Sequence, residues 1–182
     1  GRENQKCMLE DMSRAISDGS YLILSDKDTL RAMTNKNSNV QINVYENIEE
    51  QKYDISYISE GYYKITNNKT GKVLEVAGSR KDVEANLREG IWNSGNNQLW
   101  EILHTGNNKY CIKSKLGTFV DVSSGSMAEN NNIWMYSYNG TEAQKWVLDS
   151  SRTEQSVQPI EDGTYVLRSA LRSDRVIDIS GG

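Results

Sequence analysis

The feature that most constrains this chain is an internal repeat with a spacing of 46 or 47 residues. A glutamine followed two positions later by a large or sulfur-containing residue recurs four times along the sequence. The four pairs are Gln5–Cys7, Gln51–Tyr53, Gln98–Trp100 and Gln144–Trp146. Such near-even recurrence predicts that one supersecondary unit is used several times.

Three further strings recur with the glutamine motif, and each has the composition of a short strand. One contains a tyrosine, one places an acidic residue between aliphatic residues, and one begins with Asn39, Asn86 or Asn132. All are β-prone and are bounded by Gly, Asn, Ser or Lys turns. Three units of four strings predict an all-β chain of twelve short strands. Closing these strands into a barrel capped by hairpins satisfies their edges.

The distance from each repeat glutamine to the next repeat tyrosine places the domain boundaries. It is 12 residues inside the array, but 16 residues before it and 21 after it. We therefore expect one complete domain at residues 18–149, with units at 18–55, 60–103 and 107–149. The flanks are expected to be the tail of a preceding repeat (1–9), two linkers (10–17 and 150–160) and the opening half of a following repeat (161–182).

The first flank leaves an alternative open, and the flanks together bear on the parent protein. Met8 and Met12 have helical spacing, so a short amphipathic helix is the alternative near the start. Because the sequence opens inside a repeat, we expect it to be part of a longer, tandem array.

Charge and composition exclude several classes of partner. The chain has 21 Lys and Arg against 25 Asp and Glu, without a basic cluster, which argues against nucleic acid. No apolar run approaches the ~20 residues that span a bilayer, so we expect no membrane insertion. Cys7 and Cys111 lack the spacing of zinc or redox motifs. We expect two free thiols there, with a disulfide as the alternative.

Catalytic motifs are weakly represented, so we expect no enzymatic activity. His104 is the single histidine, and it lies in a turn between two units without a nucleophile motif nearby. The acidic residues Glu75 and Asp121 occupy equivalent places in different units, which keeps them apart and argues against a glycosidase pair. We expect no cofactor and no metal, since no dinucleotide, phosphate or calcium motif is present.

The repeat strings resemble those of the ricin B-type lectin family, the Gln-x-Trp repeat carbohydrate-binding modules. The resemblance is strongest at residues 139–146, Asn-Gly-Thr-Glu-Ala-Gln-Lys-Trp. It implies a β-trefoil with pseudo-threefold symmetry, flanked here by partial repeats of neighbouring trefoils. It also implies that Trp100 and Trp146 pack in the core, and that the repeat glutamines bond to backbone and brace a sugar-binding loop.

The same resemblance assigns candidate sugar-binding residues, and the third unit fits them best. An acid accepts sugar hydroxyls, an aromatic plane covers the apolar face of the ring, and amides complete the set. In the third unit these residues are Asp121, Tyr136, Trp134, Asn139 and Gln144.

The other two units match the family pattern less well. In the second unit the candidates are Glu75, Trp92, Asn97 and Gln98, with Gly90 at the usual ring position. The first unit is expected to be inactive, because Arg31 is assigned to the acid position and Asn43 to the ring position.

The resemblance also gives an expected role with two alternatives. It implies a bacterial, secreted or cell-surface module that anchors a larger protein to glycans, with covalently linked neighbouring domains. The expected ligands are galactose-type sugars, or plant or mucosal polysaccharides. The main alternative is a protein-binding trefoil, with a receptor or a protease as partner, whose sugar pockets are relics. A purely structural spacer is the other alternative.

Overall fold

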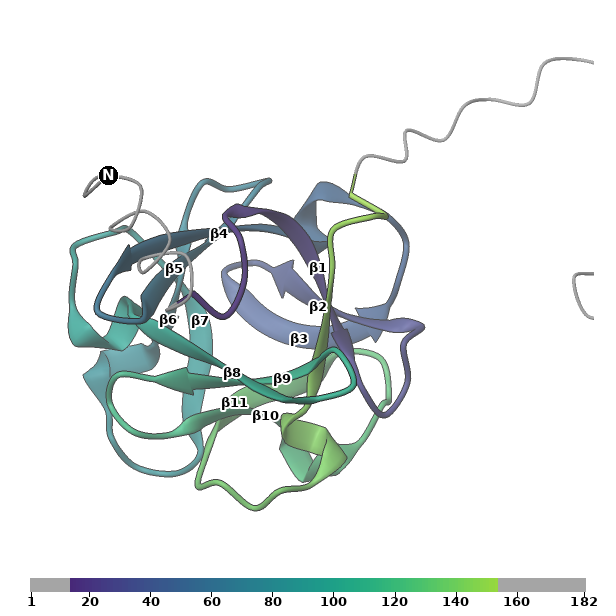
Figure 1. The fold of residues 1–182 in the computed structure, drawn as a ribbon. Helices are drawn as coiled ribbons and strands as arrows, with labels where there is room; N and C mark the ends of the chain where they lie inside the picture. Colours follow the sequence, from purple (N-terminus) through teal and green to yellow (C-terminus); the bar gives the residue numbers. More distant parts are fainter. Residues whose placement is uncertain (1–13, 154–182) are drawn as a thin grey trace, which may run out of the picture.

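The computed structural model describes residues 14–153 and shows a closed antiparallel barrel (Figure 1). Six strands form the barrel, and each pairs with its neighbour until the last strand pairs with the first. The barrel strands are β1 (Gly19–Ser25), β4 (Lys52–Ser59), β5 (Tyr62–Asn67), β8 (Trp100–Gly106), β9 (Lys109–Ser114) and β12 (Trp146–Asp149). Closure leaves no barrel edge unpaired, as the repeat predicts.

Three hairpins close one end of the barrel, one from each unit. They are β2 (Arg31–Lys36) with β3 (Asn39–Val44), β6 (Val73–Val76) with β7 (Ala85–Gly90), and β10 (Phe119–Val122) with β11 (Asn131–Tyr136). The second strand of each hairpin also pairs with the second strands of the other two. The twelve strands therefore form an all-β trefoil with a pseudo-threefold axis, which confirms the predicted fold class. The predicted flanking repeats at 1–9 and 161–182 lie outside the described residues.

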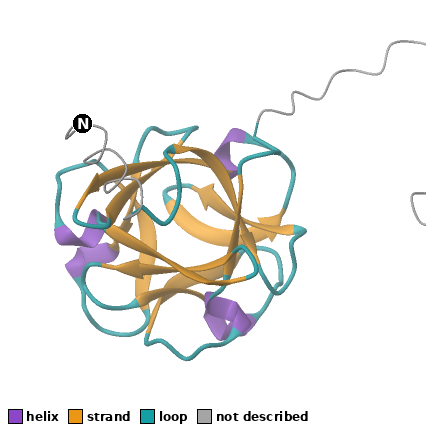
Figure 2. Cartoon of the chain, viewed as in Figure 1, coloured by secondary structure: helices purple, strands orange, loops and turns teal. Residues whose placement is uncertain are grey.

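Single 3₁₀ turns connect the strands at the periphery of the barrel (Figure 2). Three of them end on the repeat glutamines: η1 (Glu49–Gln51), η3 (Asn96–Gln98) and η5 (Glu142–Gln144). The other two, η2 (Ala77–Ser79) and η4 (Ser123–Gly125), follow the first strands of the second and third hairpins. No helix in this part of the chain is long and apolar enough to cross a membrane.

The residue two positions after each repeat glutamine packs in the centre of the barrel. Trp100, Trp146 and Tyr53 are fully buried in one hydrophobic cluster. Each indole donates its Nε1 hydrogen to a backbone carbonyl, Trp100 to Leu74 O and Trp146 to Val120 O, both at 3.3 Å. A buried indole needs such an acceptor, so these bonds fix the rings as well as satisfy them. The predicted core role of both tryptophans is confirmed.

A ring of three asparagines joins the units where the second hairpin strands meet. Asn39 donates from Nδ2 to Asn132 Oδ1 at 3.1 Å, and Asn132 donates to Asn86 Oδ1 at 2.9 Å. Asn86 completes the circle by donating to Asn39 Oδ1 at 2.8 Å. These are the residues that open the third recurring string of the sequence. These asparagines recur in the sequence because they form hydrogen bonds between the units.

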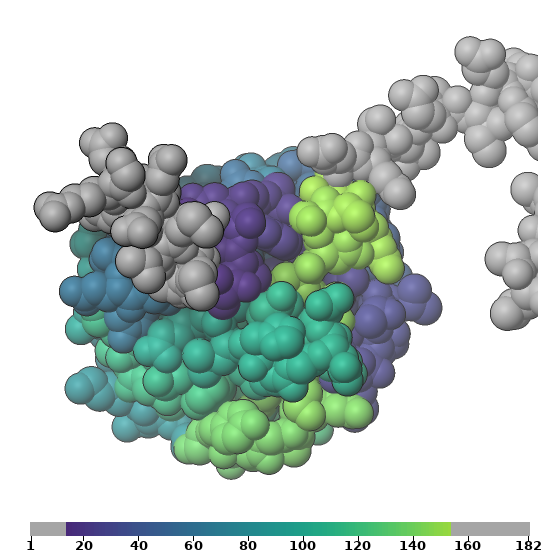
Figure 3. Space-filling model, in the orientation of Figure 1, coloured from purple at the N-terminus to yellow at the C-terminus, as the bar shows by residue number. Residues whose placement is uncertain are grey.

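The two ends of the described chain lie next to each other. Thr153 Oγ1 donates to the backbone oxygen of Ser20 at 3.4 Å, and the space-filling view shows the first and last coloured segments side by side (Figure 3). Cys111 is a free, buried thiol, whereas Cys7 lies outside the described residues.

Glu89 is an exception to the apolar lining of the core. It occupies the β7 position that Ile42 and Met135 occupy in the other units, and it is 4% exposed. Thr70 Oγ1 donates to its Oε2 at 2.8 Å, while Oε1 has no hydrogen-bond partner among the described residues. Burial raises the pKa of Glu89, and the Thr70 hydrogen bond and the Lys72 charge act in the opposite direction.

This burial predicts a specific pH dependence of stability. When the pKa of a carboxyl group is higher in the folded state than in the unfolded state, the group stabilises the fold. This contribution is complete at pH values below the unfolded-state pKa. That contribution is lost as the pH rises through the folded-state value. We expect Glu89→Gln to stabilise the protein by about 1 kcal/mol where Glu89 is ionised, with the difference disappearing as the pH falls and Glu89 becomes protonated. Thermal unfolding of both proteins across this pH range measures the effect.

The exposed Glu60→Gln in the turn between β4 and β5 is the control, because it makes the same substitution outside the core. A Glu89→Gln difference that stays constant with pH would contradict the interpretation.

Candidate functional site

Each repeat glutamine holds a loop next to its hairpin by hydrogen bonds to the loop backbone. Gln144 Oε1 accepts the N–H of Asn139 at 2.9 Å, and its Nε2 donates to Ser137 O at 2.8 Å. Gln98 makes the same two bonds to Asn93 and Ile91, both at 2.8 Å.

Gln51 repeats this pattern with Glu46 N at 2.8 Å and Val44 O at 2.7 Å. All three glutamines are fully buried. The predicted hydrogen bonds from the glutamines to backbone are therefore confirmed, and a hollow lies between hairpin and loop in each unit.

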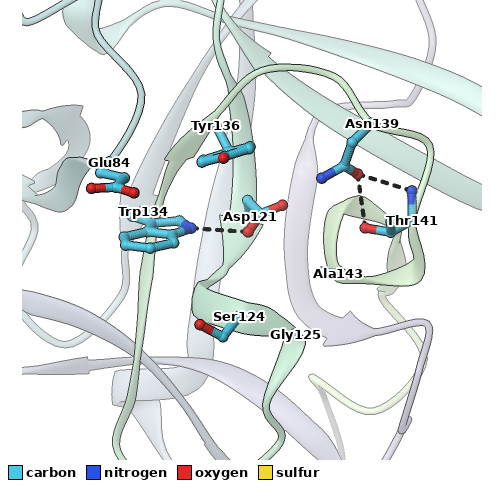
Figure 4. Close-up of a pocket in the computed structure, with 9 residues that line it drawn as sticks. All are labelled: Glu84, Asp121, Ser124, Gly125, Trp134, Tyr136, Asn139, Thr141 and Ala143. Carbon is cyan, nitrogen blue, oxygen red and sulfur yellow. Dashed lines mark hydrogen bonds between the residues drawn. The ribbon is translucent and has the colours of Figure 1, made fainter.

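The hollow of the third unit collects most of the residues predicted there. It is a cavity of about 390 Å³, open to the surface (Figure 4). Its lining residues are Glu84, Asp121, Ser124, Gly125, Trp134, Tyr136, Asn139, Thr141 and Ala143. Gln144 lies behind the loop instead of in the lining. We call this cavity the third hollow.

Asp121 supplies a buried carboxylate to the third hollow. It lies on β10 directly opposite Trp134 of β11 and is 5% exposed. Trp134 Nε1 donates to Asp121 Oδ1 at 2.9 Å, a bond drawn in Figure 4. Burial raises the pKa of Asp121, while hydrogen bonds from Trp134 and Gln144 act in the opposite direction. The carboxylate is thus oriented by its neighbours.

Two aromatic side chains form the wall next to this carboxylate. Trp134 and Tyr136 are two residues apart on β11, so their side chains share one face of the strand. Their ring centroids lie 6.0 Å apart, and the ring planes are 20° from parallel. Both rings are partly exposed and line the cavity. They give the third hollow a flat apolar surface beside an acceptor.

Asn139 faces this wall from the loop held by Gln144. Its Oδ1 accepts from Thr141 N at 3.0 Å and from Thr141 Oγ1 at 2.8 Å. These bonds fix the amide so that Nδ2 points toward Asp121 and Tyr136 (Figure 4). The third hollow therefore offers an acceptor, a donor and an aromatic plane, which suits a ligand with hydroxyl groups and one apolar face.

The hollow of the second unit has a different chemistry. Glu75 is buried, and its Oε1 accepts from Arg88 Nε at 2.9 Å while its Oε2 accepts from Gln98 Nε2 at 2.9 Å. Asn97 also lines this cavity of about 650 Å³. The ring position holds Gly90, where a Cβ would clash with the Glu75 carboxylate. The carboxylate is therefore paired with a cation and has no ring at the position of Tyr136.

The structure does not bring the predicted Trp92 into this second hollow. Trp92 follows the end of β7 and is not among the residues that line the cavity. Its ring instead lies under the ammonium of Lys64, 5.5 Å from the centroid.

In the first unit, the assignment of Arg31 to the acid position was wrong. The residue at the acid position is Thr34, because it lies opposite Gln41 in the first hairpin as Asp121 lies opposite Trp134 in the third. Its Oγ1 accepts a hydrogen bond from Gln51 Nε2 at 3.1 Å. Arg31 lies at the start of β2 and pairs with Glu129 at 2.8 Å. The first unit also has a cavity, of about 330 Å³, and Asn43 is one of the residues that line it. The first hollow therefore has neither a carboxylate at the acid position nor a ring at the aromatic one.

Sequence patterns did not reveal several residues of the third hollow. Glu84 comes from the second unit, so no pattern within the third unit points to it. Ser124 and Gly125 belong to the η4 turn after β10, and its counterpart η2 in the second unit has a different sequence, so no recurring string points to them. Thr141 lies inside the string that most resembles the family, and that string was the available signal for it.

A comparison with protein families matches the chain to the Ricin-type beta-trefoil lectin domain-like family, at residues 49–116 and 96–182. A comparison with curated proteins found no match. Among solved structures, the chain is similar to ThreeFoil, a designed 3-fold symmetric protein. That alignment has 27% identity and a TM-score of 0.69, and it covers 72% of this chain and 98% of ThreeFoil.

Two natural proteins are also similar. One is 1,3Gal43A, an exo-beta-1,3-galactanase from Clostridium thermocellum, with 26% identity, a TM-score of 0.65 and coverage of 71% of this chain and 29% of that chain. The other is a ricin B-like lectin from Macrolepiota procera in complex with lactose, with 13% identity, a TM-score of 0.65 and coverage of 74% and 97%.

The glutamine bonds predict a local effect of removing one. We expect Gln144→Ala to destabilise the protein by about 1 to 3 kcal/mol, because the Asn139 N–H and Ser137 O lose buried partners. The Asn139 amide should then exchange its hydrogen faster, which hydrogen exchange read by NMR measures.

Gln51→Ala is the matched control. It should cost similar stability while leaving the Asn139 amide protected. Equal loss of Asn139 protection in both variants would show that the loop is not held locally.

Proposed function

The chain belongs to the Ricin-type beta-trefoil lectin domain-like family, and from this membership we propose that it binds carbohydrate through the third hollow. The domain is a binding module without catalysis of its own, and it anchors a larger protein to glycans. The sugar stacks on the wall of Trp134 and Tyr136, and its hydroxyls bond to Asp121 and Asn139.

One observation carries this proposal: a buried carboxylate lies beside an aromatic wall and opposite a fixed amide donor. Charge-assisted hydrogen bonds from hydroxyls to a carboxylate are among the stronger ones, and they gain strength where water is sparse. A Trp–Tyr plane covers the C–H face of a sugar ring. The first and second hollows each lack part of this set. The third hollow is therefore the proposed site.

Galactose-type sugars, or plant or mucosal polysaccharides, are the proposed ligand class. The similarity to an enzyme described as an exo-beta-1,3-galactanase supports this class. Asp121 lines the hollow with a carboxylate, and the two oxygens of a carboxylate suit a pair of neighbouring hydroxyls.

We place the module in a secreted or cell-surface protein, bacterial in origin, with covalently linked neighbouring domains. The galactanase supports this arrangement, since this chain covers only 29% of it. The family match that runs to residue 182 supports a further repeat after the described domain. One shallow site binds a sugar at about mM to tens of μM, and linked sites raise the avidity.

Removing the Asp121 charge tests the function directly. We expect Asp121→Asn to weaken binding of a galactoside at least about tenfold, because hydrogen bonds to a charged acceptor are lost. A glycan array followed by calorimetry on the best ligand measures this. The exposed Asp54→Asn on β4 removes the same charge outside the hollow and should bind normally.

If the folded protein binds no glycan on the array, the carbohydrate function is ruled out. The protein-binding alternative would then account for the exposed aromatic side chains such as Tyr138.

The raised pKa of Asp121 predicts how binding depends on pH. The ionised carboxylate accepts sugar hydroxyls, so affinity should fall as acidification protonates it, at a higher pH than for an ordinary aspartate. Trp134→Phe removes a hydrogen bond that lowers this pKa, and should move the midpoint of the loss to still higher pH. Affinity measured across a pH series gives both midpoints, and a midpoint that Trp134→Phe leaves in place would contradict this account.

A further inference from the structure

The three hollows differ in the charges that line them. The second hollow is lined by Lys72 and Arg88 together with Glu75 and Glu89, and the first by Lys36 together with Glu46, Glu50 and Glu129, so each contains at least one cation beside its acids. Among the described residues that line the third hollow, none is a lysine or an arginine, whereas Glu84 and Asp121 are both acidic. The lining of the third hollow therefore carries two carboxylates and no cationic side chain.

Glu84 reaches the third hollow from a neighbouring unit. It precedes β7 in the second unit, and its backbone N–H donates to Met135 O of β11 at 2.7 Å. Its backbone φ of 65° lies in the left-handed region. The hydrogen bond thus holds the backbone of residue 84 against the strand that carries Trp134 and Tyr136. Figure 4 shows its carboxylate beside Trp134.

Lys27 contacts a residue that lines the third hollow but does not line the hollow itself. Lys27 Nζ donates to the backbone oxygen of Gly125 at 2.8 Å, so its charge is directed at the η4 turn. This bond positions Gly125 from the first unit. All three units therefore contribute to the third hollow, and the side chains that face the ligand remain neutral or acidic.

We propose that Glu84, together with Asp121, selects the third hollow's ligand by charge: it takes neutral and amino sugars and rejects sugars with a carboxylate or sulfate on the bound ring. This inference rests on the proposed carbohydrate function. An anionic ring would face the buried carboxylate of Asp121 and the exposed one of Glu84, whereas an ammonium group would gain an ion pair. Glu84 is exposed, so its share of this selection is modest and weakens with salt.

Three ligands of the same ring type test the selection on the full chain. They are methyl β-galactoside, galactosamine and galacturonic acid, titrated by calorimetry or ligand-observed NMR at low and high salt. We expect galactosamine to bind more tightly than the galactoside, and galacturonic acid to bind more weakly. Glu84→Gln should reduce the galactosamine preference by about two- to fivefold, because an exposed ion pair contributes an interaction of this size.

Asp82→Asn is the matched control. Asp82 is exposed in the same loop, pairs with Arg80 at 3.4 Å and does not line the hollow. It should leave all three affinities unchanged. Because both variants remove one negative charge, a general effect of net charge would change them equally.

The outcomes separate the inference from the function that it rests on. If galacturonic acid binds as tightly as the galactoside, or if Glu84→Gln and Asp82→Asn act alike, selection by Glu84 is disproved while sugar binding stands. If none of the three sugars nor any glycan on the array binds, the proposed function fails, and selection of a sugar by charge fails with it.

Discussion

The buried amide of the repeat glutamine is the interaction on which the hollows of this protein depend. A buried side-chain amide must satisfy both its donors and its acceptor, and here the partners are backbone groups of one short loop. Gln98 adds a bond from Nε2 to Glu75 Oε2, and Gln51 adds one to Thr34 Oγ1. The same amide therefore holds the loop and orients the residue at the acid position, whether or not that residue suits a ligand.

Because the glutamine holds the loop in every unit, the other residues of each hollow can differ while the fold stays symmetric. The acid position is Thr34, Glu75 or Asp121, and its partner across the hairpin is Gln41, Arg88 or Trp134. The glutamines beneath them are identical. Core packing and amide bonds thus maintain the hollow, and a few exposed or half-buried side chains decide its chemistry.

The sequence predicted what the repeat encodes within one unit. The spacing of the glutamines led to twelve strands, and the third unit's acid, rings and amide do converge on one cavity. The Arg31 assignment failed because the first hairpin closes through a tight turn at Asn37 and Ser38, with φ of 55° and 67°. The other two hairpins have longer connections, and the string around Arg31 that was matched to the acid string lies three positions before Thr34, the residue that the strand register aligns with Asp121.

The repeat pattern could not predict contacts between units. Glu84 lines a hollow that belongs to the next unit, and Glu89, whose backbone N–H donates to Ser38 O of the first unit, replaces an apolar residue in the core. The direction of the Trp92 side chain, away from the second hollow, depends on packing against Lys64 of another strand.

The asparagine ring gives the pseudo-threefold axis a sense of rotation. Each amide gives one hydrogen and receives one, so the three bonds circulate from Asn39 to Asn132 to Asn86 and back. Reversing a single amide would set donor against donor on one side and acceptor against acceptor on the other. An aspartate would have no hydrogen to pass on, and a serine would be too short to reach. A cycle of this kind requires the same side chain three times, even in a protein whose outer surfaces have diverged.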